Sequence, residues 1–538
     1  MRANSSTKTC VLAGARHEPL ATGRCIPYHV GAEESLMRHH RNGLPWALSI
    51  VLGFGLAATQ LLVAGNRHVA RAAEAASASA SAALPQDQAV LAKAYRFERG
   101  GWIYVHLEGA PHDIGYQHGY LLASEIADAF ASVRLNAMHS SGRDWTFFRR
   151  AAREMLWPKI DDEYKSELQG IADGLKDKKV KLDLDDVVAM NAFQELPDYY
   201  VPWLDAQTKA SSAPTNSPKD SGPGHCSAFV ATGSWTKDHR IVMGHNNWTN
   251  YADGERWRII FDIVPQQGFR MLMDGFPGVI ASDDDFGVNS NGLMITETTI
   301  SNFHGWDPSG KAEFVRARKA MQYAGSIDDY VKIMLDGNNG GYANDWLLAD
   351  RKTGEIAQFE LGLKRTKLWR TKDGYFVGSN FVSDPGVMKE DTTFDPANPA
   401  SSPNARHARW EELMSESKGQ IDATMAQVFL SDHKDSFTKK YGADLRTLCG
   451  HGDADPETYP DWQSKPFQPH GAVQGKVMNA QMAQEMSFVA RMGHPCGSDF
   501  NAAKFLQEHS EYSWQASVLG DMNAGPWTQF HAGEHAAQ

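Results

Sequence analysis

The chain has 538 residues, enough for one large domain or two ordinary ones. With 42% hydrophobic and 22% charged residues, it has the composition of a globular protein. The formal net charge of −12 argues against nucleic acid or an anionic membrane surface as the partner.

The first element along the chain is an uncharged, largely apolar run over residues 46–66, directly after a basic cluster at 38–41. This layout is typical of a secretory signal or an N-terminal membrane anchor, whereas a buried core helix is the alternative. Ala73-Glu74-Ala75 and the Ala/Ser tract that follows then offer small-residue cleavage sites. We therefore expect an N-terminal extension over residues 1–75 and an exported protein, either periplasmic or secreted, with residues 46–66 as its signal or anchor.

Strand and helix patterns follow the N-terminal extension. Residues 100–109 alternate like a strand, and a turn then leads into a helix. Residues 161–176 place their apolar side chains on one helical face, and residues 182–196 supply another helix with an acidic start. Residues 206–224 contain almost nothing that enters a core, which predicts a solvated linker.

Beyond the linker the sequence pattern becomes that of antiparallel hairpins. Pairs of strand-like runs flank short polar turns at 227–235 and 240–248, 256–264 and 269–276, 345–350 and 356–361, and 367–372 and 375–380. Helical stretches follow at 314–335 and 405–432. Stacked hairpin sheets with helices outside them indicate a layered α+β body.

The cysteines divide into one free thiol and one predicted disulfide. Removal of the N-terminal extension leaves Cys226, Cys449 and Cys496 of the five cysteines. In an oxidising compartment two of these three are expected to pair. Cys449 and Cys496 both lie in loop-like contexts near the C-terminus, so we predict a disulfide between them and a free thiol at Cys226.

Cys226 stands at the first position of a strand-like run, directly behind the predicted linker. Cleavage before it would give the cysteine a free α-amino group, whose pKa of about 7.7–8.0 in peptides suits a base for its own side chain. One residue would then supply both nucleophile and base. Asparagine side chains or backbone N–H groups would suit the oxyanion hole that such a reaction also needs.

Several short motifs, taken in order, resemble one known family. Cys226-Ser227-Ala228, followed by residues 244–248 (GHNNW), resembles the phospholipase B-like branch of the N-terminal-nucleophile (Ntn) hydrolases. That branch lies close to the acyl-coenzyme A:isopenicillin-N acyltransferase family. The resemblance continues in four further stretches at 167–174, 295–299, 344–347 and 470–477.

The resemblance implies a four-layer αββα sandwich with two stacked antiparallel sheets. Residues 76–538 would form one such domain, cut into a smaller chain over 76–225 and a larger chain over 226–538. The autocleaved bond would be His225–Cys226, with Cys226 as the nucleophile.

The same resemblance implies roles for four further residues. His245 and Asn247 would neighbour the nucleophile on the second strand of the hairpin, and Asn344 would donate to the oxyanion. Arg406 would lie near the nucleophile, and Arg409 is its rival at a neighbouring helical position.

The function that follows is an exported, autoproteolytic hydrolase that cleaves acyl amide or ester bonds through a cysteine thioester. Its partner would be a small acyl amide or a lipid, with no cofactor and no metal. An acyltransferase and a catalytically inactive Ntn-fold binding protein are the alternatives. A papain-like protease is disfavoured, because it needs a helix that starts at the cysteine and residues 227–231 have strand composition. Substrate identity, acyl-chain length and oligomeric state stay open.

Overall fold

The computed structural model describes residues 86–209, 226–284, 286–460 and 464–536. The predicted N-terminal extension over 1–75, its apolar run at 46–66 and linker residues 210–224 lie outside this part of the chain. Residues 82–538 form one compact unit. Within the described ranges, no helix is long and apolar enough to cross a membrane.

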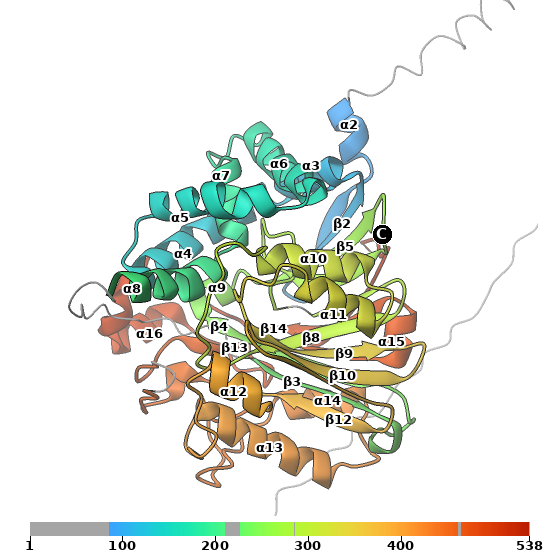
Figure 1. The fold of residues 1–538 in the computed structure, drawn as a ribbon, viewed down its shortest axis with the longest axis vertical. Coiled ribbons are helices and arrows are strands. Elements are labelled where there is room, and N and C mark those ends of the chain that lie inside the picture. The colour runs from blue at the N-terminus through green and yellow to red at the C-terminus, as the bar shows by residue number, and fades with distance from the viewer. Residues whose placement is uncertain (1–85, 210–225, 285, 461–463, 537–538) are drawn as a thin grey trace, which may run out of the picture. The chain divides into compact units, whose positions relative to one another are not determined.

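The strands form two sheets, and the predicted α+β class is confirmed (Figure 1). The larger sheet has nine strands, in the spatial order β1 (Tyr95–Arg99), β2 (Trp102–Gly109), β5 (Ile259–Pro265), β6 (Met271–Gly275), β7 (Gly287–Asn289), β8 (Leu293–Thr299), β9 (Asn344–Asp350), β10 (Glu355–Leu361) and β11 (Thr366–Thr371). The smaller sheet has six strands, in the order β12 (Gly374–Gly378), β3 (Ser227–Thr232), β4 (Val242–Asn250), β13 (His470–Asn479), β14 (Ser487–Met492) and β15 (Thr528–His531).

Three of the predicted hairpins form as expected, because the β3–β4, β5–β6 and β9–β10 pairs are antiparallel. Two expectations were wrong. The nine-stranded sheet is not wholly antiparallel, since β2 and β5 run parallel across a long connection that contains several helices. The runs at 367–372 and 375–380 do not pair with each other, because the turn between them carries the chain from β11 in one sheet to β12 in the other.

The two sheets pack face to face around a shared apolar core. Side chains of both sheets meet there, among them Ala228, Val230 and Met243 from the smaller sheet and Ile260 and Leu347 from the larger one. The alternation of a strand sends its other residues outward. Thus Phe229 and Ala231 pack under α13 (Ser402–Glu416) and α14 (Ala423–Leu430).

Helices also cover the outer face of the nine-stranded sheet. Figure 1 shows α10 (Glu313–Tyr323) and α11 (Ile327–Leu335) on the side of the sheets opposite α13. Ala317, Met321 and Tyr330 of these helices share one core cluster with Ile295 and Leu348 of β8 and β9. The predicted helical stretches at 314–335 and 405–432 are therefore two helices each, broken where the chain turns.

The remaining helices lie mainly between β2 and β3 or in the last third of the chain. They are α2 (Gln86–Leu91), α3 (Pro111–Leu121), α4 (Ala123–Ser141), α5 (Trp145–Ala151), α6 (Asp162–Asp177), α7 (Leu184–Asn191), α8 (Val201–Lys209), α9 (Tyr251–Gly254), α12 (Pro385–Asp391), α15 (Ala480–Gln484) and α16 (Ala502–Glu508). Helix α6 confirms the helix predicted over 161–176. Helix α8 includes residues 206–209, so this part of the predicted linker is helical instead.

Helices α3 and α6 approach each other unusually closely. A Cβ atom on Gly115 of α3 would lie 1.9 Å from the carbonyl oxygen of Glu167, and one on Gly170 of α6 would lie 2.2 Å from that of His112. Only glycine fits at such backbone-to-backbone contacts. The glycines of this helix pair are therefore packing residues.

Candidate active site

Cys226 lies immediately before β3, at the end of a strand pair that brings the predicted site residues together. In the β3–β4 pair, Ala228 is opposite His245 and Ser227 is opposite Asn246. One further step along the ladder sets Cys226 beside Asn247. Residues two apart share a face of a strand, so Cys226, His245 and Asn247 face the same side, toward the nine-stranded sheet.

The Cys226 side chain is buried, with 1% of the residue exposed. Its Sγ lies 3.8 Å from Oε1 of Glu297, near the end of β8 in the opposite sheet. Burial, and next the negative charge of Glu297, raise the pKa of the Cys226 thiol well above its ordinary value. The thiol therefore carries its proton at neutral pH, and Glu297 is placed to accept that proton.

Glu297 is itself held in place by two side chains. The hydroxyl of Tyr342 donates to Oε1 at 3.1 Å. With its amide turned so that the nitrogen faces the carboxylate, Asn344 donates to Oε2 at 2.9 Å. Asn344 begins β9 and is paired with Thr299 at the end of β8, which brings it to this carboxylate. The structure thus places Asn344 in the site, in contact with Glu297.

Arg406, on α13, is fully buried and fixes the backbone at the nucleophile. Its Nη1 donates to the carbonyl oxygen of Cys226 at 2.6 Å and to the hydroxyl of Ser227 at 2.9 Å. Its Nη2 donates to Oδ1 of Asn380 at 2.6 Å, and its guanidinium lies 4.4 Å from the centre of the Trp248 ring. The planar, charged guanidinium of Arg406 therefore contacts the start of β3, the segment after β12, and β4.

Arg409 lies one turn further along α13 and contacts acidic side chains instead of the nucleophile. Its guanidinium forms a bidentate pair with Asp432, at 2.9 and 2.7 Å, and donates to Glu412 at 3.1 Å. It has no contact with Cys226 among these interactions. Of the two arginines that the sequence offered, Arg406 is the one that the structure brings to the candidate nucleophile.

Exchanging each arginine for lysine should separate these two roles. We expect Arg406→Lys to lower kcat by at least tenfold, because one ammonium cannot hold Cys226, Ser227 and Asn380 together. Arg409→Lys keeps a charge beside Asp432 and should stay within about twofold of the wild type. Steady-state kinetics on the two purified variants check this, and equal losses in both would contradict the assignment.

His245 and Asn247 are both buried in the layer between the sheets. Burial, and next the positive charge of Lys476, lower the pKa of His245 well below its ordinary value, so the imidazole is neutral. The Nδ2 of Asn247 has no hydrogen-bond partner within the residues that the structure describes. A buried amide donor without a partner is costly, and one beside a nucleophile is suited to a substrate oxygen.

A buried ionic cluster lies next to His245. Lys476 of β13 is opposite His245 in the sheet and contacts the carboxylates of Asp274, at 2.6 Å, and Asp284. The hydroxyl oxygen of Ser282 lies 3.0 Å from a carboxylate oxygen of Asp274 and 2.9 Å from one of Asp284, and Asp284 lies 3.9 Å from Nδ1 of His245. This cluster fixes β13 to the opposite sheet beneath the site.

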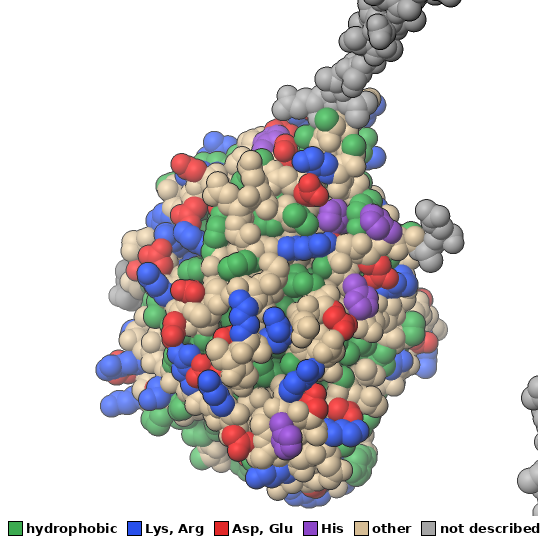
Figure 2. All heavy atoms as spheres, turned by 90° about the vertical axis from the view of Figure 1, so that its right-hand side faces the viewer, with side chains coloured by type: hydrophobic (Ala, Val, Ile, Leu, Met, Phe, Trp, Pro, Cys, Tyr) green, Lys and Arg blue, Asp and Glu red, His purple; other side chains and the backbone are tan. Residues whose placement is uncertain are grey.

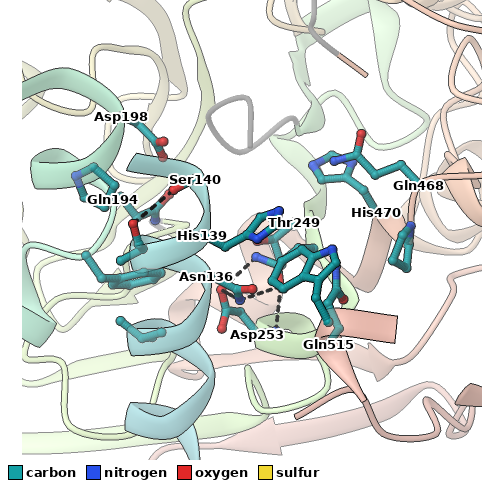
Figure 3. A pocket seen from close by; sticks show the side chains of 17 residues that line it. Asn136, His139, Ser140, Gln194, Asp198, Thr249, Asp253, Gln468, His470 and Gln515 are labelled. Carbon is teal, nitrogen blue, oxygen red and sulfur yellow. Dashed lines mark hydrogen bonds between the residues drawn. The ribbon is translucent and has the colours of Figure 1, made fainter. Parts of the chain in front are cut away.

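A cleft, whose lining side chains Figure 3 shows, lies at the C-terminal end of β4. Thr249 and Asn250 of β4 line it, so along the strand it starts about 7 Å beyond the position of Asn247, at ~3.3 Å per residue. His470 forms another part of the wall. Burial, and next the positive charge of Arg406, lower the pKa of the His470 imidazole. His139 and Trp514 stack with ring centres 3.6 Å apart.

The outer surface differs from the cleft in its charges. On the face shown in Figure 2, basic and acidic side chains are interspersed over the whole surface, and neither sign gathers into one patch. The residues that line the cleft include Asp198 and Asp253 but no Lys or Arg, within the described part of the chain.

Sequence reasoning missed Glu297, Tyr342 and Asn380. Glu297 lies in the predicted strand at 295–299, but nothing local marks a carboxylate as the partner of a thiol 71 residues away. Tyr342 and Asn380 have positive φ angles of 44° and 64°, a conformation that sequence patterns do not show. The resemblance of residues 295–299 to a family motif was the signal that could have pointed to Glu297. The predicted cleavage bond lies at the border of the described residues, since His225 is outside them.

The predicted disulfide is not present, because Cys449 and Cys496 are both free thiols. Instead, Cys496 Sγ lies 3.6 Å from Nε2 of His451 and 3.2 Å from the hydroxyl of Ser498. Histidine and serine side chains therefore lie beside the Cys496 sulfur, and the Cys449 thiol is hydrogen-bonded to Cys496 in place of a covalent bond.

Comparison with known proteins supports the resemblance seen in the sequence. The family model described as phospholipase B matches residues 125–370. The chain is 25% identical over 313 residues to phospholipase B-like 1 of Caenorhabditis elegans and 30% identical over 154 residues to phospholipase B-like 2 of Rattus norvegicus. A protein of Archaeoglobus fulgidus without a functional name is 26% identical over 264 residues. Over these segments the chain is thus similar to the phospholipase B-like proteins.

These similarities cover only part of each chain. The matched segments are 47%, 52% and 26% of this chain for the proteins of A. fulgidus, C. elegans and R. norvegicus. They span 42%, 54% and 26% of the length of those relatives. The strands that carry Cys226, His245 and Glu297 fall inside the segment that the family model matches.

Proposed function

We propose that the protein is a hydrolase of the Ntn class that cleaves acyl amides through a thioester on Cys226. The observation that carries this proposal is the contact between the Cys226 thiol, just before β3, and the Glu297 carboxylate. Beside it lies the Nδ2 atom of Asn247, which has no hydrogen-bond partner among the residues that the structure describes. The two packed sheets with helices on both outer faces suit the four-layer sandwich of that class.

Maturation would be the first use of the thiol. Cys226 Sγ attacks the carbonyl carbon of His225, its proton passes to Glu297, and the bond between that carbon and the Cys226 nitrogen breaks. The leaving α-amine takes the proton, and water then hydrolyses the thioester to leave a carboxylate on His225. Glu297 serves as the base at this stage because the α-amine is still part of a peptide bond.

Turnover would then use the freed amine. The thiol attacks the acyl carbonyl of the substrate, the α-amino group carries the proton to the departing amine, and water releases the acid from the thioester. Asn247 donates to the oxygen of the tetrahedral intermediate. Asn344 keeps Glu297 in position, and Arg406 holds the Cys226 carbonyl so that the new N-terminus does not move.

Removal of the Asn247 amide should reduce turnover and spare folding. We expect Asn247→Ala to mature and to lower kcat by roughly 10²–10³, with little change in KM, because its nitrogen binds the oxyanion only. Asn246→Asp is not a suitable comparison, since Asn246 donates to the carbonyls of Leu430 and Leu448. Asn523, which is exposed in the loop before β15, offers Asn523→Ala as the control, and equal kcat values for the two variants would remove Asn247 from the mechanism.

The charges of the cleft favour an amide over a phospholipid. A phosphate head group needs cationic partners, and the described residues of the cleft wall supply none. Aromatic and apolar side chains, including Phe193 and Trp514, suit an acyl chain, and Asp198 suits a neutral or cationic amine portion. We therefore assign N-acyl amines as the substrate class.

A direct comparison of substrates tests this assignment. The purified protein would be incubated with N-acyl amines of several chain lengths and, separately, with diacyl and lysophospholipids, and released fatty acid would be measured. We expect the amides to be cleaved with the higher kcat/KM. Preferential release from phospholipids would overturn the substrate class, and acyl transfer to an added amine in place of hydrolysis would favour the acyltransferase.

A further inference from the structure

Four potential metal ligands converge in the C-terminal third of the chain, away from the proposed nucleophile. They are His433, Cys449, His451 and Cys496, and their ligand atoms all lie within 4.8 Å of one another. His433 follows α14, Cys449 and His451 precede a short turn of helix at Gly452–Ala454, and Cys496 follows β14. Three separate loops therefore meet at one point.

The distances within this cluster match the edges of a tetrahedron around zinc. Zn–N bonds of about 2.0–2.1 Å and Zn–S bonds of about 2.3 Å imply tetrahedral edges of about 3.3 Å between nitrogens and about 3.6 Å between nitrogen and sulfur. The two Nε2 atoms of His433 and His451 are 3.1 Å apart, and Cys496 Sγ is 3.6 Å from Nε2 of His451.

The chemistry of the donor set agrees with this geometry. Two thiolates and two imidazoles form a closed Cys₂His₂ set, which is typical of structural zinc and leaves no position for a substrate. Cys449 and His451 are buried, whereas His433 and Cys496 are partly exposed, so an ion has a path from solvent. The other ring nitrogen of His451 lies 4.0 Å from the carboxylate of Asp453, beyond the range of a direct hydrogen bond.

We propose that His433, Cys449, His451 and Cys496 bind one structural Zn²⁺ ion. Binding forms two Zn–S and two Zn–N bonds and releases the two thiol protons to solvent. No oxidant is needed, in contrast to the disulfide that the cysteine count predicted.

The proposed ion would support the strand that carries the catalytic residues. The carbonyl of Leu448, next to Cys449, accepts from Asn246 of β4 at 2.9 Å. Gly450, between two of the ligands, packs so closely on Trp248 that a Cβ would lie 2.2 Å from its ring. Trp248 in turn lies under Arg406. The segment 448–451, which carries two of the proposed ligands, therefore packs against β4 and, through Trp248, supports Arg406.

Metal analysis of the purified full-length protein tests this site. After growth with added Zn²⁺, we expect elemental mass spectrometry to find about one zinc ion per chain. Cys449→Ala and His433→Ala should each lose most of the metal, whereas Cys226→Ala, which removes a thiol elsewhere, should keep it. Wild-type protein without zinc, or with a Cys449–Cys496 disulfide in peptide mapping, would overturn the proposal.

A second measurement on the wild-type chain does not depend on how the variants fold. The protein would be stripped with a chelator and titrated with Co²⁺. We expect visible bands of tetrahedral cobalt and a thiolate charge-transfer band that saturate at one equivalent, and a rise in Tm when Zn²⁺ is restored. Absence of both the bands and the Tm change would contradict the site even if the variants are unstable.

Discussion

Cys226→Ala should remain a single uncut chain and should release no acid from any acyl amide. The thiol is the nucleophile of both the self-cleavage and the turnover, and alanine offers no substitute. Folding should be affected little, because Cys226 lies just before β3 and its carbonyl, which Arg406 holds, is unchanged. Gel electrophoresis shows the cleavage, and a fatty-acid release assay shows the turnover.

Cys226→Ser is the matched variant for this experiment. Serine keeps the shape and can form an ester, but its hydroxyl is a much weaker nucleophile at neutral pH. We expect slow cleavage over hours and loss of most turnover. A Cys226→Ala protein that is cut at residue 225 and active would rule out Cys226 as the nucleophile.

Glu297→Gln should slow maturation by roughly 10²–10⁴, the range that a positioned general base contributes. The glutamine has the same shape and can still accept from Tyr342, but it cannot take the proton from the thiol 3.8 Å away. A cell-free translation time course, followed by the appearance of the two fragments, measures the rate. The slow step should be the cleavage itself.

Glu360→Gln supplies the control for that loss. Glu360 is also buried, at 0% exposure, but it accepts backbone N–H groups of Ser383 and Asp384 and does not contact Cys226. We expect this variant to mature at the wild-type rate. Wild-type maturation of a folded Glu297→Gln protein would show that another group accepts the thiol proton.

The elements that depend on local patterns could be predicted from the sequence. The polar turn between the strand-like runs of β3 and β4 and the apolar face of α6 are both visible in the residues themselves. Strand topology could not be read this way, because the choice between pairing β12 with β11 or with β3 depends on how the two sheets pack.

The site residues also divide into those that the sequence indicated and those that depend on long-range packing. Cys226 stood out because of its position behind the linker, whereas His245 and Asn247 were implied by the resemblance to a known family. Arg406 reaches Cys226 across 180 residues, and only the resemblance to known enzymes pointed to it. The His433–Cys496 cluster was missed because its ligands come from three loops, with no pair at the spacing of a known zinc motif.

The most direct test of the account is the N-terminal sequence of the mature protein. Active wild-type protein would be separated by electrophoresis, and the larger fragment would be read by Edman degradation and weighed by intact mass spectrometry. The account predicts the sequence Cys-Ser-Ala-Phe, with Cys226 as the first residue and a free thiol. Full activity in a chain that is uncut at this bond, or cut elsewhere, would contradict it.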